Sequence, residues 1–329
     1  MSHNIDVSTG KPAMAYVGPP PWHELGEQVK KGASVQEMRR KGQLDWRVRL
    51  SQVKFDAITG DKQVEQIDNW WRVMYRSDTR AVLDIVGPEY VPFQNEEVLA
   101  FFQEYVEAGE MYLETVGSLN GGRQVWALAN MEDSFDLRGK DKVEGRILLM
   151  NPHQYGKGAL IKFTPIRVVC WNTLMMAIGG GGDSLKLWHT SEFNKERQDE
   201  AKRRLGLARD RFQGFKHDAK TLSLVELTHE DALKILAKVM KSDTKKPLEE
   251  QPRTVQRIFE LYSGVGYGSQ LASAKDTAWG LLNAVTQYYD HEYGRSVNSR
   301  IQNSWFGSGD QRKRGMFVEL LQLATENAG

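Results

Sequence analysis

The chain has 329 residues, enough for one large or two modest domains, and its hydrophobic content of 40% fits a globular protein with a sizeable core. Its formal net charge of +1 excludes a global field that attracts nucleic acid or membranes, so any such site must be a local patch. A single cysteine, Cys170, excludes an internal disulfide framework and a cysteine-rich zinc site, and it fits a reducing, cytoplasmic setting. Because the sequence has neither an apolar run of roughly 18 residues nor an export pattern, we expect no membrane span and no secretion.

The N-terminal third is predicted to be extended and then mostly β. Residues 1–21 are polar and contain a Gly-Pro-Pro-Pro stop, which indicates an extended arm. A short helix is predicted over 34–41, because Ser34 and Glu37 make a capping-box pattern. Alternation then predicts a strand over 45–56 with a bulge near Ser51, followed by a hairpin of 69–76 and 81–86.

The stretch from Met111 to Ile178 is predicted to form the centre of the fold. Asn120-Gly121-Gly122 separate two β-prone runs, and this is a strong hairpin signal because both central turn residues tolerate positive φ. Pro165 suits the first turn of a helix, where a missing N–H costs nothing. The predicted order is a helix over 95–108, strands over 111–119, 123–129, 145–150 and 158–164, and a helix over 166–178 that ends in four glycines.

Beyond a possible short strand at 185–189, the pattern becomes helical. Helices are predicted over 192–220, 228–241, 253–263, 277–289 and 310–325, the second of them capped by Thr228 with Asp231 at the third helical position. The predicted fold class is therefore α+β: an antiparallel β-hairpin sheet with helices packed behind it, followed by a helical C-terminal region. We expect an α+β body over 1–190 with its core at 95–178, and a mostly helical region over 191–329.

Motifs for catalysis, metals or cofactors are missing from the sequence. No phosphate loop or dinucleotide fingerprint occurs, and the seven histidines are scattered without ligand spacing. Cys170 falls on the apolar face of a predicted helix, which favours a buried structural thiol. We therefore expect no catalytic residue, no metal and no cofactor.

Aromatic residues recur beside basic ones, the combination with which single-strand binders stack bases and neutralise phosphates. Neighbours in a strand, such as Lys162 and Phe163, point to opposite faces, so an ordinary solvated surface explains the pattern as well. Arg312-Lys313-Arg314 opposes the dipole of the last helix, which suggests either an anionic partner or a carboxylate elsewhere in the chain. The candidate nucleic-acid-binding residues are Arg123, Tyr155, Lys157, Lys162, Arg167, Trp171, Lys186, Arg312, Lys313 and Arg314, with Tyr155 or Trp171 as the stacking platform.

Blocks along nearly the whole chain resemble a family of phage- and plasmid-like proteins that is known only as a domain of unknown function. They are Pro21-Trp-His-Glu-Leu-Gly26, Leu113-Glu-Thr-Val-Gly-Ser-Leu119, Gly122-Arg-Gln-Val-Trp-Ala-Leu128, Phe163-Thr-Pro-Ile-Arg-Val-Val-Cys-Trp-Asn-Thr-Leu174, Trp279-Gly-Leu-Leu-Asn-Ala-Val-Thr-Gln-Tyr288 and Trp305-Phe-Gly-Ser-Gly309. This chain has Trp171 where the family usually reads Asn, and Asn151-Pro-His-Gln-Tyr where it often reads Asn-Ser-His-Asp-Gly. By element order alone, the chain also resembles single-strand annealing recombination proteins, in which the fold lines an oligomeric ring with a basic groove.

Three hypotheses for the function remain open. The first is a non-catalytic, homo-oligomeric protein of a phage or plasmid that binds or anneals single-stranded DNA in recombination or replication, in the host cytoplasm. The second is a phage interaction protein that modulates a host replication or defence factor. The third is an enzyme whose site combines His23, Glu24 and His153, although His23 also fits a loop that packs Trp22 onto the body.

Overall fold

The computed structural model describes residues 5–19, 24–59, 62–167, 172–173, 184–206, 208–294, 303–304 and 307–326. The fold is α+β, as the sequence predicts, with antiparallel sheets and a helical C-terminal region. The strands are β1 (Met14–Val17), β2 (Glu27–Val29), β3 (Val48–Thr59), β4 (Lys62–Arg76), β5 (Val82–Val86), β6 (Tyr112–Leu119), β7 (Gln124–Leu137), β8 (Asp141–Pro152), β9 (Ala159–Arg167), β10 (Asn172–Thr173) and β11 (Ser184–Leu187). The α-helices are α1 (Val35–Lys41), α2 (Asn95–Ala100), α3 (Gln103–Glu107), α4 (Lys195–Gly206), α5 (Ala208–Leu224), α6 (His229–Met240), α7 (Arg253–Glu260), α8 (Ala278–Gln287) and α10 (Ser308–Glu326). Shorter turns are η1 (Asn120–Gly122), η2 (Leu248–Glu250), η3 (Leu261–Val265) and η4 (Tyr288–Glu292).

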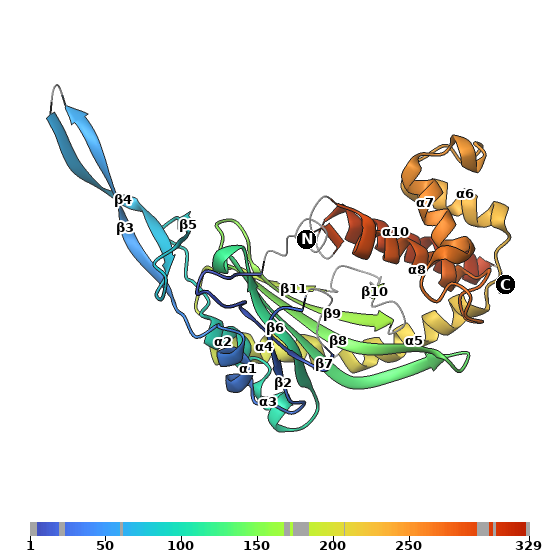
Figure 1. Cartoon of the computed structure of the whole chain (residues 1–329), viewed down its shortest axis with the longest axis horizontal. Coiled ribbons are helices and arrows are strands. Elements are labelled where there is room, and N and C mark those ends of the chain that lie inside the picture. The colour runs from blue at the N-terminus through green and yellow to red at the C-terminus, as the bar shows by residue number, and fades with distance from the viewer. Residues whose placement is uncertain are drawn as a thin grey trace.

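The larger sheet is built around an antiparallel meander of β6, β7, β8 and β9 (Figure 1). The predicted hairpin turn at Asn120-Gly121 is confirmed, and both residues have positive φ, at 55° and 68°. The strands β7 and β8 run further than predicted, because their pairing continues past a bulge between Asn130 and Ser134 to a second turn after Leu137. The order across the sheet is β10-β9-β8-β7-β6-β1-β2, and β11 also pairs with β9.

The N-terminal segment contributes a strand to this sheet, contrary to the extended arm predicted for 1–21. Strand β1 lies between β6 and β2, and Ala15 pairs with Val116. Ala13 to Tyr16 are buried, because this short apolar run has a side chain for each face of the sheet. The first four residues and 20–23 lie outside the described part of the chain.

The helix predicted over 166–178 is wrong at its start, where β9 continues as a strand. Pro165 pairs with Gly145 of β8, and Arg167 pairs with Asn172 of β10. On the other side of β9, β11 pairs with 159–162 and β10 with 166–167, so no described strand pairs with Pro165 there. A proline is tolerated at such a gap, because no neighbour needs its N–H. Cys170, most of the predicted helix and the four glycines lie outside the described residues.

The smaller sheet, β3-β4-β5, projects from the body as a long hairpin (Figure 1). The predicted strand over 45–56 and the hairpin of 69–76 and 81–86 are confirmed, but β4 begins seven residues earlier than predicted, at Lys62. The register shifts between Gln52 and Val53, close to the predicted bulge at Ser51, but the extra residues, 69–71, lie on β4 and not on the strand for which the bulge was predicted. Asp68 holds the bulged part of β4: its carboxylate accepts hydrogen bonds from the backbone N–H groups of Trp70 and Trp71, both at 2.7 Å.

The other predicted helices are present, and one of them is broken between α2 and α3; residue 207, between α4 and α5, lies outside the described residues. The helix predicted over 95–108 forms α2 and α3, and the one predicted over 192–220 forms α4 and α5. The N-caps expected from sequence are confirmed: Ser34 accepts from the backbone N–H of Glu37, and Thr228 accepts from that of Asp231, both at 3.1 Å. No helix in the described ranges is both long and apolar enough to cross a bilayer.

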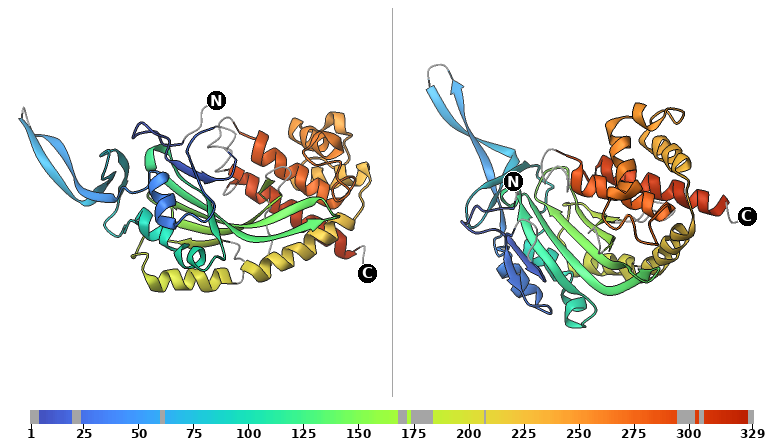
Figure 2. Two further views of the ribbon diagram at one scale, coloured as in Figure 1. Left: turned by 60° about the horizontal axis from the view of Figure 1, so that its bottom comes forward. Right: turned by 45° about the vertical axis from the view of Figure 1, so that its right-hand side comes forward.

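Helices pack on both faces of β9. Helices α4 and α5 run along one face of the sheet (Figure 2), where Phe163 lies 5.9 Å from Phe212 between ring centroids. The adjacent Lys162 points the other way, toward α10. One buried hydrophobic cluster continues from the sheet into the C-terminal helices through Phe215, whose ring lies 5.9 Å from that of Phe317. The sheet and the helical region therefore share a core.

Candidate nucleic-acid interface

Four of the ten sequence-predicted residues come together at the end of the large sheet nearest the projecting hairpin. Arg123 directly precedes β7, Tyr155 and Lys157 lie in the loop between β8 and β9, and Lys186 lies near the end of β11. Gln124 of β7 pairs with Pro152 of β8, and Leu187 of β11 pairs with Ala159 of β9, so these four strand ends lie at the same end of the sheet. All four side chains are exposed.

Tyr155 forms an exposed aromatic pair with a residue that the sequence analysis missed. Its ring lies edge-to-face with Trp71, with the centroids 5.7 Å apart, and Tyr155 is 56% exposed. The backbone N–H of Tyr155 donates to Asp84 Oδ2 at 2.9 Å, which fixes the loop against β5. The sequence held a partial signal: adjacent tryptophans in a strand point to opposite faces, so at least one must be exposed, and in the structure both are, Trp70 at 64% and Trp71 at 38%.

A second exposed aromatic residue at this end of the sheet contacts a lysine. Lys186 Nζ lies 3.8 Å from the centroid of the Trp188 ring, a cation–π contact, and Trp188 is 49% exposed. Lys157 Nζ donates to Gln154 Oε1 at 2.9 Å. We call this set the aromatic–basic end; it comprises Trp71, Arg123, Tyr155, Lys157, Lys186 and Trp188.

Lys162 has a different environment from these residues. It is 2% exposed, and its Nζ lies 3.0 Å from Asp310 Oδ1. Burial lowers the pKa of Lys162 to about 8, although the negative charge of Asp310 acts to raise it. Arg314 Nε donates to the other oxygen of Asp310, also at 3.0 Å. Both cations are therefore engaged by one carboxylate of α10.

The basic run at the start of α10 also makes internal contacts. Lys313 is fully buried, and its Nζ lies 2.7 Å from Asp290 Oδ1 and 2.8 Å from Ser304 Oγ. Arg312 donates to the backbone carbonyl of Val239. Because α10 begins at Ser308, earlier than predicted, Lys313 lies in its second turn, where the helix dipole is weak. Its partner is a carboxylate elsewhere in the chain, one of the two explanations that the sequence left open. Arg167 ends β9, and its side chain and Trp171 lie outside the described part.

His153, from the enzyme hypothesis, is a core residue. It is fully buried, its Nε2 lies 3.1 Å from Asn95 Oδ1, and its ring lies edge-to-face with Trp46, with centroids 5.4 Å apart. Burial lowers the pKa of His153 to about 3, so the ring is neutral near pH 7. Glu24 is exposed, and His23 lies outside the described residues. Within the described ranges, no three histidine, cysteine or acidic side chains are grouped as metal ligands.

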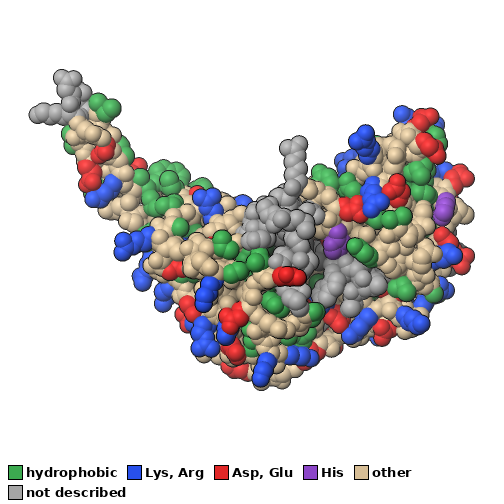
Figure 3. Space-filling model, in the orientation of Figure 1, with side chains coloured by type: hydrophobic (Ala, Val, Ile, Leu, Met, Phe, Trp, Pro, Cys, Tyr) green, Lys and Arg blue, Asp and Glu red, His purple; other side chains and the backbone are tan. Residues whose placement is uncertain are grey.

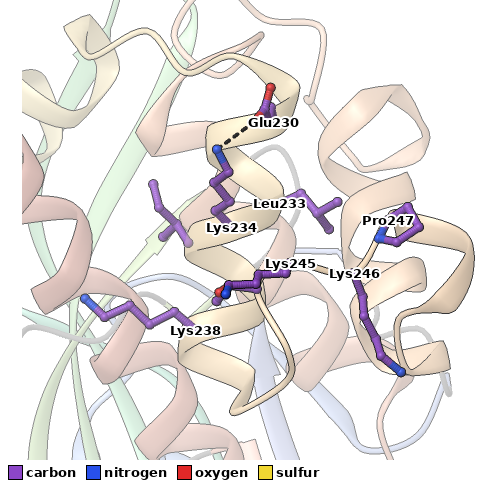
Figure 4. A pocket seen from close by; sticks show the side chains of 9 residues that line it. Glu230, Leu233, Lys234, Lys238, Lys245, Lys246 and Pro247 are labelled. Atoms are coloured by element: carbon purple, nitrogen blue, oxygen red, sulfur yellow. Dashed lines mark hydrogen bonds and ion pairs between the residues drawn. The ribbon is translucent and has the colours of Figure 1, made fainter.

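A basic pocket lies far from this end, on α6 and the segment that follows it (Figure 4). It is open, with a volume of about 520 Å³, and four lysines and one glutamate line it together with apolar side chains. Lys234 Nζ lies 2.6 Å from Glu230, and Lys238 pairs with Glu319 of α10. Lys245 and Lys246 are exposed. The protein thus carries a second group of exposed lysines, and no tryptophan is among the described residues that line this pocket.

Comparison with known proteins gives a family but no activity. No curated protein matches the chain, and no solved structure does. A family model described as "Domain of unknown function (DUF932)" matches residues 82–305, which is more than half of the chain. The match includes the meander and most of the aromatic–basic end, and it leaves out the projecting hairpin of β3 and β4. The chain therefore belongs to this family, the domain of unknown function DUF932.

Proposed function

We propose that the protein binds single-stranded nucleic acid at the aromatic–basic end and acts without catalysis. The observation that carries this proposal is the pairing of exposed rings with exposed cations where neighbouring strands end. Tyr155 stands beside Lys157 in one loop, and Trp188 stands against Lys186 at the adjacent strand end. Rings of this kind stack bases of any sequence, while lysines neutralise the phosphates between them.

The local character of the charge supports a single strand as the ligand. With a net charge of +1, the protein has no field that would draw in a rigid duplex from a distance. A flexible strand can place successive bases on separate rings and its phosphates beside separate lysines. Base stacking contributes about 1–3 kcal/mol per base. Stacking therefore carries a large share of the proposed affinity.

We further propose that the bound strand is presented for annealing by a homo-oligomer, in recombination or replication of a phage or plasmid. Annealing needs phosphates held by Lys and Arg, and bases that remain free to pair. It needs no general acid or base. The setting comes from the sequence resemblance alone, and the buried, neutral His153 fits a non-catalytic role.

The test is the binding of a fluorescently labelled oligo-dT to the full chain, measured by polarisation over a salt series. Tyr155→Ala should weaken binding by about 5- to 150-fold, the equivalent of about 1–3 kcal/mol for one stacked base. Lys157→Ala should lower the slope of log affinity against log salt by about 0.7, the value for one lost phosphate contact on a single strand.

The matched control is Lys245→Ala with Lys246→Ala, which removes two exposed lysines at the α6 pocket. These changes should leave affinity and slope unaltered, and a matched duplex should bind more weakly than the single strand. An absence of binding at low salt would contradict the proposal, as would an equal loss in the control variant.

A further inference from the structure

The outer part of the projecting hairpin exposes four large apolar side chains. We call residues 53–68 the arm. Within it, Phe55 is 51% exposed, Ile58 84%, Val64 42% and Ile67 46%. Hydrophobic side chains are visible along the projecting arm in Figure 3. An isolated two-stranded hairpin is marginally stable in water and needs a further strand or a packing surface. The arm is therefore expected to be covered by a partner.

The two faces of the arm differ in polarity. Alternation along paired strands places Val53, Phe55, Ala57 and Val64 on one face, where Gln66 and Asp68 lie opposite Phe55 and Val53. The opposite face carries Ile58 and Ile67 together with a polar ladder: Lys54 Nζ lies 3.0 Å from Glu65 Oε1, and Gln63 Nε2 donates to Asp56 Oδ2 at 2.9 Å. A partner must match one face that is partly apolar and one that is mostly polar.

The arm also has an open backbone edge. Strand β3 pairs only with β4 among the described strands, so its other edge has no strand partner along the arm; at the base of the hairpin the Gln94 side chain hydrogen-bonds the backbone of Val48. A long exposed edge of this kind is a template for pairing with a strand of another chain. Strand β4 is open along the arm too, since β5 reaches only 72–75.

The charge pattern selects β3 of a second copy as the partner strand. When β3 pairs antiparallel with itself about Phe55, Lys54 of one copy lies opposite Asp56 of the other, twice per dimer, and the two Phe55 rings meet at the axis. Opposite charges across strands are stabilising, and like charges are destabilising. The β4 part of the arm carries two acids, Glu65 and Asp68, against one cation, Lys62, so two copies of β4 would bring a net negative charge together, whereas the β3 part of the arm is balanced.

We propose that two copies of this chain pair through antiparallel β3 edges centred on Phe55, forming a continuous four-stranded sheet with apolar side chains along one face. The contact is isologous, as in most symmetric dimers. This inference gives a surface to the homo-oligomer of the proposed function, and it requires no nucleic acid. The base of the projecting hairpin, where β4 ends, is fixed to the body: Arg76 is fully buried, pairs with Asp6, and lies 2.6 Å from Asp78. Both copies would thus present their arms in the same way.

The first experiment measures the mass of the full chain by light scattering without nucleic acid, for the wild type, Lys54→Asp, Asp56→Lys and the double variant. The wild type should exceed the mass of one chain. Each single variant should dimerise about tenfold more weakly, because two cross-strand pairs per dimer change from attraction to repulsion. The double variant should recover, since it exchanges the charges.

The second experiment tests the register by oxidation in a Cys170→Ser background. Phe55→Cys should form an intermolecular disulfide, because the two thiols meet at the axis, whereas the control Ile58→Cys should not, because it lies opposite Gln52 of the partner subunit.

A monomeric wild type overturns the proposal, as do single variants that keep the wild-type mass, a double variant that fails to recover, or a cross-link at Ile58→Cys alone. Loss of oligo-dT binding with the mass unchanged would count against the proposed function and leave the β3 contact standing.

Discussion

Lys162 Nζ lies 3.0 Å from Asp310 Oδ1, and this ion pair joins strand β9 to helix α10 across 148 positions of sequence. The same carboxylate accepts a hydrogen bond from Arg314 at 3.0 Å. Because Phe163 packs on α5 from the other face of β9, the two neighbouring residues attach the sheet to helices on its two sides. The pair thus ties the helical region to the sheet.

Removing the carboxylate should cost more stability than removing the lysine. We expect Asp310→Ala to lower the free energy of unfolding by about 3–5 kcal/mol, the range for breaking a buried ion pair from one side. Lys162→Met should cost less, because an apolar side chain fills the buried site and Asp310 keeps its contact with Arg314. Urea unfolding measures both changes. Lys234→Met, at an exposed pair, is the control and should change stability by about 1 kcal/mol or less. A larger loss for Lys162→Met than for Asp310→Ala would contradict this account.

His153 should make the protein acid-sensitive. Burial lowers its pKa in the folded state to about 3, from an ordinary value of 6.5. Between these values the unfolded chain binds a proton that the folded chain does not, so stability must fall as the pH falls from 6.5 toward 3. We expect His153→Gln to be less stable at pH 7 and to show a flatter decline between pH 6.5 and 4. Urea unfolding at a series of pH values tests this.

The decline should flatten without vanishing in that variant. Burial also lowers the pKa of His189, to about 4, so this histidine titrates over much of the same range. A variant slope equal to that of the wild type would exclude His153 as a source of the acid sensitivity.

Gly117 should not tolerate a methyl group. It pairs with Trp126 across β6 and β7, and a Cβ would lie 2.2 Å from Trp126 Cη2. Gly117→Ala should therefore destabilise the protein by about 1–3 kcal/mol, the usual cost of overpacking a core. Gly214 of α5 has open space around it, so Gly214→Ala should instead stabilise by about 0.5–1 kcal/mol through helix propensity. Thermal unfolding of the two variants should shift in opposite directions, and equal shifts would contradict the packing argument.

The features that could be predicted from the sequence are those set by a few adjacent residues. The turn at Asn120-Gly121 and the caps at Ser34 and Thr228 depend on a few adjacent residues, and each is confirmed. The break between α2 and α3 was missed because Phe101 and Phe102 continue the apolar stripe and carry no helix-stop signal. Pro165 was misjudged because its tolerance in β9 depends on where β10 and β11 pair, which no local pattern encodes.

In the candidate site, too, only the features that depend on neighbouring residues could be predicted. Tyr155 and Lys157 are neighbours in sequence, so their shared position was predictable. The burial of Lys162 and Lys313 was not, because their carboxylate partners come from Asp310 and Asp290, which lie elsewhere in the chain. The sequence alone does not show whether a basic side chain is exposed or buried, because this depends on its tertiary partners.

Variants of Trp188 and Lys186 distinguish base stacking from phosphate neutralisation in the proposed binding. Trp188→Ala removes a stacking surface, so it should weaken oligo-dT binding by a similar factor at every salt concentration, about 5-fold or more. Lys186→Met removes a charge while keeping most of the side-chain length, so its effect should shrink as salt rises, and the salt slope should fall by about 0.7. Polarisation titrations at several salt concentrations measure both quantities. If both variants changed the slope equally, or if neither changed affinity, the cation–π pair would not be part of the nucleic-acid interface.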